Sequence, residues 1–174
     1  MPNATYVKLE SYTVPVAGVT SVTLGSGGTI PQTYTDLVLK ISARSDGSQI
    51  YNYPFNIRFN GATSDTNLSS RGFEGNGSSS VSYTNPFVYL NASNGGTSTS
   101  PTFSSHDVYL HNYTSVTNKL ISVDGVLENN ATTYYGSLQQ GWFATSSPLT
   151  SITIISGNTL LQYSEFTLYG VKSS

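Results

Sequence analysis

Apolar and polar residues alternate with a period of two along much of this chain, which is the pattern of a strand with one buried face. The segments 36–44 (DLVLKISAR) and 54–60 (PFNIRFN) show it most clearly. We predict further strands at residues 5–14, 21–24, 106–113, 119–126, 133–143, 151–155 and 165–171. Apolar residues are nowhere spaced as in a long amphipathic helix, so the pattern predicts roughly nine or ten strands and almost no helix.

Glycine and asparagine lie between these segments, for example at 25–28 (GSGG), 46–47 (DG) and 60–61 (NG). They favour tight turns, so we expect hairpins to dominate the topology and the sheets to be antiparallel. The segments 62–81 and 91–101 are rich in Gly, Ser, Thr and Asn and are expected to be long loops. Because no repeat or linker divides the chain, residues 1–174 are predicted to form one antiparallel β-sandwich domain.

The composition narrows the partners that such a sandwich would have. Charged residues make up 9% of the chain and the formal net charge is -2, so its long-range field is weak and we expect no nucleic-acid partner. The absence of cysteine excludes disulfides and thiolate metal sites. The chain shows neither a basic and apolar leader at its start nor an apolar run of membrane-spanning length, so we expect synthesis in the cytoplasm and no membrane partner.

The ionisable residues form no recognisable catalytic or metal-binding pattern. His106 and His111 are five residues apart on one predicted strand, which places them on opposite faces and prevents a shared metal. Asp46 and Asp124 each precede a glycine, which is typical of a turn. No serine lies in a Gly-x-Ser-x-Gly elbow, and segment 25–28 lacks the lysine of a phosphate loop, so it is expected to be a hairpin turn. We therefore predict no enzyme, no cofactor and no metal.

Two alternatives stay open on composition alone. Asp65 with loop carbonyls, or Asp124 with Asn129 and Asn130, would supply the oxygen ligands that calcium prefers. The chain would be a glycan-acting enzyme if two of its carboxylates formed a catalytic pair. Their spacing in the sequence does not give their distance in space.

An aromatic cluster gives the best case for a ligand site, because sugars are often bound by flat rings on an open sheet face. The cluster contains Tyr134, Tyr135 and Trp142, followed by Phe143. Tyr134 and Trp142 share one parity of the predicted strand, whereas Tyr135 and Phe143 share the other. Part of the cluster is therefore expected to pack in the core.

Three segments resemble the small structural proteins of tailed bacteriophages, especially phages of cyanobacteria and other aquatic bacteria. They are residues 30–39 (IPQTYTDLVL), 57–61 (IRFNG) and 164–171 (SEFTLYGV). In that group the first leads into a strand and the second closes a strand with an Asn-Gly turn. The third is the terminal strand of a jelly-roll-like sandwich, so the resemblance implies that fold here.

The function that this resemblance implies is a virion role. We expect a capsid decoration or cement protein on the exterior of the virion, a homotrimer that bridges subunits of the major capsid protein. Its subunit contacts would involve Tyr6, Val7, Leu9 and Tyr12 if the segment 5–14 lies at a sandwich edge, although this segment would equally suit an internal strand. The alternative is a tail-fibre or adhesin-like module that binds a host glycan through Tyr134, Tyr135 and Trp142. We expect the first, because 174 residues leave no room for a fibre shaft beside a sandwich.

Overall fold

All regular structure in the described part of the chain is β-structure. The computed structural model describes residues 5–48, 51–52, 55–91, 93–130 and 134–172, and these ranges contain no helix. The prediction of an all-β protein is confirmed. The predicted strand starts Pro54 and Thr133 lie outside the described residues.

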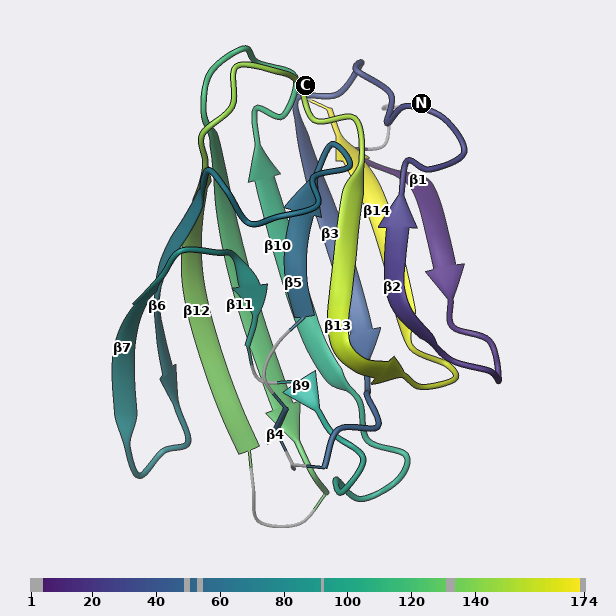
Figure 1. The fold of residues 1–174 in the computed structure, drawn as a ribbon, viewed down its shortest axis with the longest axis vertical. Coiled ribbons are helices and arrows are strands. Elements are labelled where there is room, and N and C mark those ends of the chain that lie inside the picture. Colours follow the sequence, from purple (N-terminus) through teal and green to yellow (C-terminus); the bar gives the residue numbers. More distant parts are fainter. Residues whose placement is uncertain (1–4, 49–50, 53–54, 92, 131–133, 173–174) are drawn as a thin grey trace.

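Two antiparallel sheets face each other and form a sandwich (Figure 1). In spatial order, the described strands of the eight-stranded larger sheet are β1 (Tyr6–Thr13), β14 (Glu165–Val171), β3 (Asp36–Ala43), β10 (Ser104–His111), β11 (Lys119–Glu128), β12 (Tyr134–Phe143), β6 (Leu68–Gly75) and β7 (Ser80–Asn85). Those of the four-stranded smaller sheet are β2 (Val19–Leu24), β13 (Ile152–Leu160), β5 (Phe55–Phe59) and β8 (Tyr89–Leu90). The short strands β4 (Tyr51–Asn52) and β9 (Ser93–Asn94) pair with each other.

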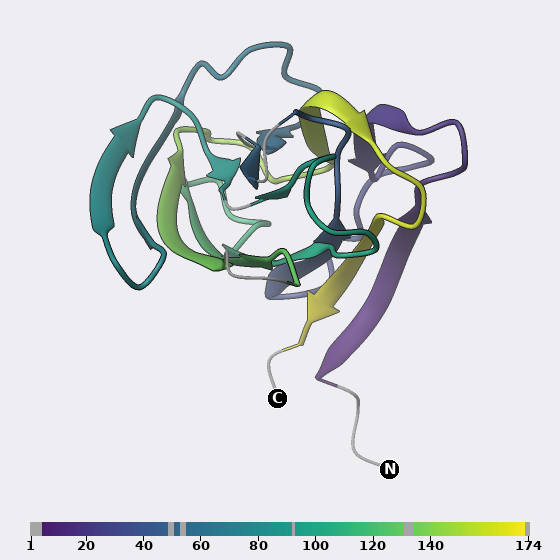
Figure 2. The same ribbon diagram turned by 90° about the horizontal axis from the view of Figure 1, so that it is seen from below.

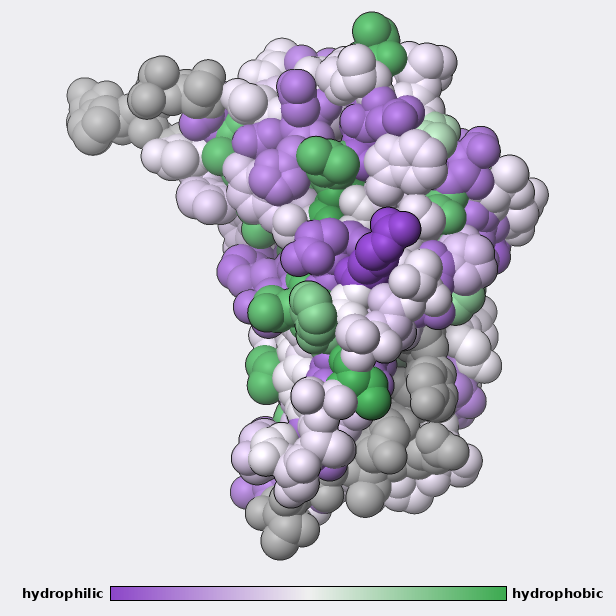
Figure 3. Space-filling model, turned by 90° about the vertical axis from the view of Figure 1, so that its left-hand side faces the viewer, coloured by the Kyte–Doolittle hydropathy of each residue, from purple (hydrophilic) through white to green (hydrophobic). Residues whose placement is uncertain are grey.

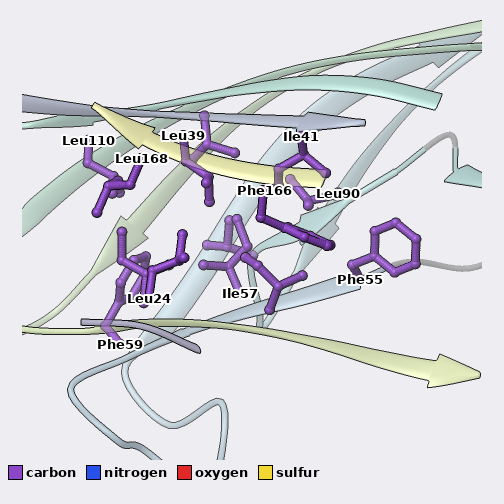
Figure 4. Packing of buried hydrophobic residues seen from close by; sticks show 14 of the residues in the cluster. Leu24, Leu39, Ile41, Phe55, Ile57, Phe59, Leu90, Leu110, Phe166 and Leu168 are labelled. Atoms are coloured by element: carbon purple, nitrogen blue, oxygen red, sulfur yellow. The ribbon is translucent and has the colours of Figure 1, made fainter. Parts of the chain in front are cut away.

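The core lies between the two sheets, where period-two alternation places the apolar side chains. Leu39, Leu110 and Leu168 from the larger sheet point toward Leu24 and Ile57 from the smaller one (Figure 4). Each of these five side chains is at most 1% exposed. Complete burial of one such side chain stabilises a fold by roughly 1.5–3 kcal/mol, so the alternation read from the sequence supplies the main driving force for this arrangement.

Most connections cross between the sheets, and the expectation that hairpins dominate is wrong. Among the described strands, neighbours in sequence pair only as β6 with β7, β10 with β11 and β11 with β12. Segment 25–28 follows β2 in the smaller sheet and leads to β3 in the larger sheet, so it is not a hairpin turn. Asn60 and Gly61 do form a turn, with φ of 54° and 69°, but the chain then crosses to the larger sheet.

The larger sheet extends beyond the smaller one, and a chain segment covers the inner face of this extension (Figures 1 and 2). Ser70 Oγ donates a hydrogen bond to the backbone oxygen of Phe87 at 2.6 Å. The ring of Tyr89 stacks on that of Tyr83 with centroids 5.6 Å apart. A Cβ added at Gly141 would lie 2.7 Å from a methyl group of Val88, so the glycine is needed for this close approach. Residues 87–89, which lead into β8 at the edge of the smaller sheet, thus cover this part of the larger sheet.

The expectation of a loop at residues 62–81 is wrong, because β6 and the start of β7 lie within it. The inward positions of β6 include Ser70 and Gly72, which give no apolar signal, while Phe73 points outward and is 60% exposed. Gly72 is small because the Tyr83 ring covers it: a Cβ there would lie 2.7 Å from the ring carbon Cζ. The other expected loop, 91–101, contains the short strand β9.

Asp124 and Gly125 lie inside β11 and do not form a turn. Gly125 is needed for packing, since a Cβ there would lie 2.7 Å from His106 Cδ2 and 2.9 Å from Ser137 Oγ. The glycine that resembled a turn signal therefore makes room for a buried histidine. Asp124 points to the opposite face of the sheet.

Candidate interaction surface

The outer face of the larger sheet, which points away from the smaller sheet, carries exposed apolar side chains. Val126 on β11, Leu138 on β12 and Phe73 on β6 are 51%, 53% and 60% exposed. Leu138 lies directly opposite Phe73 on one side and opposite Asp124 on the other. Figure 3 views the side of the molecule formed by β6, β7 and β12, where apolar residues lie as separate areas among polar ones.

A hollow with two glycines at its base lies beside these apolar groups. Gly136 is opposite Val126 and opposite Gly75, so one cross-strand row lacks side chains at two neighbouring positions. A Cβ added at Gly136 would meet no atom within 4 Å, which shows that the space above it is open. The hollow has a volume of about 450 Å³ and its walls include Phe73 and Leu138. The hollow is shallow and open to solvent.

A second hollow lies on the other side of Phe73. Its volume is about 410 Å³, and Arg71, Gln140 and Thr84 contribute to its lining. Arg71 pairs in register with Gln140 and with Thr84, so these polar side chains form the cross-strand row next to Phe73. The Phe73 ring thus separates two hollows on the outer face.

Polar groups around both hollows are available to a ligand. Within the described residues, the side chains of Arg71, Gln140 and Asp124 have no hydrogen-bond or ion-pair partner. Arg71 brings a positive charge to the second hollow and Asp124 a negative charge to the first. We call the group Arg71, Phe73, Asp124, Val126, Leu138 and Gln140 the outer-face surface.

The aromatic residues predicted from the sequence do not form one site. Tyr134 and Trp142 lie on the outer face and are 58% and 41% exposed. Eight residues separate them on one strand, a distance of about 26 Å, which is too far for both to hold one sugar ring. Tyr135 points to the inner face, where its hydroxyl donates a hydrogen bond to Glu74 Oε1 at 3.3 Å. Burial raises the pKa of Glu74 above its usual value.

The predicted subunit contacts Tyr6, Val7, Leu9 and Tyr12 all lie on β1. In the described part of the larger sheet, β1 is an edge strand that pairs only with β14. Segment 5–14 therefore lies at a sheet edge, and the alternative of an internal strand is wrong. Tyr6 is 52% exposed, whereas Leu9 and Tyr12 are partly buried against the core and Val7 is half-buried.

The ionisable residues have structural partners or lie apart. His106 is buried on the inner face and His111 is exposed on the outer face, which confirms that the two histidines lie on opposite sides. Asp65 forms an ion pair with Arg58 at 2.8 Å, and Asp46 accepts a hydrogen bond from the backbone of Thr159 at 2.8 Å. Across the described ranges, no three His, Asp or Glu side chains are grouped as metal ligands.

Comparison of the chain with protein-family models, with curated proteins and with solved structures found no match. In the part of the chain that the structure describes, no helix has the length and apolar character needed to cross a membrane. The outer-face surface and the β1 edge are therefore interpreted from their own geometry. Sequence patterns missed Phe73 because it lies in a segment whose glycines and serines indicated a loop.

Proposed function

We propose that this chain is a virion structural protein, a capsid decoration or cement protein that binds outside the shell and bridges subunits of the major capsid protein. One observation carries the proposal, namely the strand order. The strands β1-β14-β3-β10 of the larger sheet face β2-β13-β5-β8 of the smaller sheet. Along these eight strands the chain changes sheet at every step except from β5 to β8. This order supports assignment as a jelly roll, a fold found in viral capsid proteins.

Two hairpin additions account for the remaining strands of the larger sheet in this interpretation. Strands β6 and β7 follow β5, and strands β11 and β12 follow β10. Both additions join the larger sheet on the β10 side and extend it from four strands to eight. The phage-like segments 30–39, 57–61 and 164–171 lie in or next to β3, β5 and β14, which all belong to the jelly-roll part.

The β1 edge is the proposed contact with neighbouring subunits. Its outward backbone groups have no strand partner in the described residues, so a strand from another chain can pair there. Tyr6 is the exposed aromatic anchor of this edge, Leu9 and Tyr12 pack partly buried against the core, and Val7 is half-buried. A register shift between Lys8 and Glu10 limits indiscriminate pairing. In a homotrimer, several such contacts would act together and oppose dissociation.

Cryo-electron microscopy of purified particles that contain this chain tests the proposal. We expect density for the chain at regular positions on the outer surface of the shell, in threefold groups. Tyr6→Ala is expected to lower the occupancy of these positions, whereas Val116→Ala, at a 70% exposed loop residue, is expected to leave it unchanged. A chain located only on the tail, or absent from the particle, would overturn the assignment.

A further inference from the structure

We propose that the outer-face surface binds an uncharged glycan, with Phe73 as its central anchor. The site lies at the β6 and β7 end of the larger sheet, whereas β1 forms the opposite end of the described sheet (Figures 1 and 2). The inference is therefore independent of the contact proposed for β1. A chain held at one edge would present the other edge to solvent.

Three outer-face aromatic side chains form a line along the strands. Phe73 on β6 is opposite Leu138, and Leu138 lies midway between Tyr134 and Trp142 on β12. Four residues along the strand and one strand across separate Phe73 from each of the other two, about 14 Å between Cα atoms. The rings are too far apart for one sugar ring, but their even spacing suits a chain of sugar rings.

Each side of Phe73 offers a hollow of ligand size. The hollow above Gly136 and Gly75 lies on the side toward Tyr134, and the row that contains Arg71 and Gln140 lies on the side toward Trp142. Their volumes are about 450 Å³ and 410 Å³, and both are open to solvent, as a surface that binds an extended chain would be.

The chemistry around the ring matches that of a sugar. The face of an aromatic ring carries negative charge density, which attracts the C–H groups on one face of a pyranose. Gln140 and Arg71 offer planar donors beside the ring, and Asp124 offers a planar acceptor. Because these side chains make no hydrogen bond within the described residues, sugar hydroxyls can replace their water at small cost.

The charges of the surface favour an uncharged ligand. Arg71 lines one hollow, whereas Asp124 and Glu74 line the other, so the two hollows offer no cluster of cations to an anionic ligand. A nucleic acid or a sulfated polysaccharide would need a cluster of cations, and Arg71 is the single cation of this surface. A neutral chain of hexoses does not need a cluster of cations.

A glycan array tests the proposal with the purified full chain. The array carries neutral hexose oligosaccharides of increasing length, together with sialylated and sulfated ones. We expect binding to the neutral oligosaccharides, strengthening with length as more of the aromatic line is used. Phe73→Ala is expected to weaken binding about tenfold or more, the effect of removing a central aromatic anchor, while Phe73→Trp retains binding.

A second variant tests the hollow itself. Gly136→Val adds a side chain into open space and leaves the fold intact, so it is expected to block the ligand without lowering the unfolding midpoint. Val16→Ala, at an 80% exposed residue between β1 and β2, is the matched control and should bind as the unaltered chain does. Absence of any neutral ligand, a preference for sulfated ligands, or unchanged binding in Phe73→Ala would each overturn the proposal. The capsid role is tested separately, by the occupancy of the chain on purified particles.

Discussion

His106 Nε2 lies 2.7 Å from the backbone oxygen of Asn91, and this contact joins β10 to the segment just before β9. A carbonyl oxygen only accepts hydrogen bonds, so Nε2 carries the proton and Nδ1 is the unprotonated nitrogen. Within the described residues Nδ1 has no partner, and the ring of Phe55 meets the imidazole edge-on with centroids 6.4 Å apart. The histidine is therefore held neutral.

This neutral histidine makes stability depend on pH. Burial lowers the pKa of His106 to about 4, from an unfolded value near 6.5. Above about pH 6.5 the neutral histidine contributes fully to the free energy of unfolding. Below that pH the unfolded state binds a proton at this histidine, whereas the folded state does not until about pH 4. The free energy of unfolding should fall between pH 6.5 and pH 4 by a few kcal/mol, on the order of 3. Urea denaturation across this range measures the fall.

Two substitutions isolate the effect from the titration of carboxylates. His106→Gln keeps a donor near Asn91 but does not titrate, so its stability should decline less with acid than that of the unaltered chain. His111→Gln replaces the exposed histidine in the same way and is the matched control variant. Equal acid sensitivity in His106→Gln and the unaltered chain would contradict the assignment.

Arg44 organises the segment 96–102 from inside the protein. Its guanidinium, in a residue that is 6% exposed, donates hydrogen bonds to the backbone oxygens of Gly96, Ser98, Thr99 and Thr102 at 2.5–3.1 Å. Replacement by methionine removes the guanidinium donors of all four oxygens, although the Thr99 oxygen still accepts from Thr102 N and Oγ1. It should lower the free energy of unfolding by about 3 kcal/mol.

Arg44→Lys is expected to recover only part of this loss, because an ammonium lacks the planar fork that reaches several carbonyl groups. Chemical denaturation gives the stability, and hydrogen exchange reports the opening of the segment at the amides of Ser98 and Thr102. Arg71→Met, on the exposed outer face, is the control and should change stability by less than about 0.5 kcal/mol. An equally stable Arg44→Met would show that the segment is held by other contacts.

Gly125 should not tolerate a side chain. A Cβ there would lie 3.0 Å from the backbone oxygen of Asn91 as well as 2.7 Å from His106 Cδ2, so Gly125→Ala pushes directly on the His106 contact. We expect a loss of about 1 to 3 kcal/mol in thermal or urea unfolding. Gly27→Ala, with no atom within 4 Å of the added group, is expected to be close to neutral. Similar losses in both variants would refute the packing explanation.

Tyr113 joins three segments beyond the end of β10. Its side chain is fully buried, its hydroxyl donates to the backbone oxygen of Pro31, and its own backbone oxygen accepts from Leu149 N at 2.9 Å. Tyr113→Phe should cost about 1 kcal/mol, because the Pro31 oxygen loses its donor while the ring packing stays. Tyr163→Phe, at a 69% exposed residue, should leave the unfolding midpoint unchanged. No difference between the two variants would contradict the prediction.

The local pattern was sufficient for most long strands. The predicted segment 165–171 has the same bounds as β14, and the segment 36–44 exceeds β3 by one residue. Both predictions are correct because the inward side chains of these strands are large and apolar. The pattern did not predict β6, because its inward positions include Ser70 and Gly72, which are not apolar. Ser70 donates a hydrogen bond to the backbone oxygen of Phe87, and the Tyr83 ring leaves no room for a side chain at Gly72.

The sequence by itself determined that this chain forms strands with one apolar face and no helix, because side-chain alternation is a property of neighbouring residues. It also determined which of Tyr134, Tyr135 and Trp142 share a face. Only the tertiary structure decided that most connections cross between sheets, that β1 lies at an edge, and that Phe73 lies between two hollows. Strand pairing and register depend on contacts between residues far apart in the chain, and a period of two carries no information about which strands will meet.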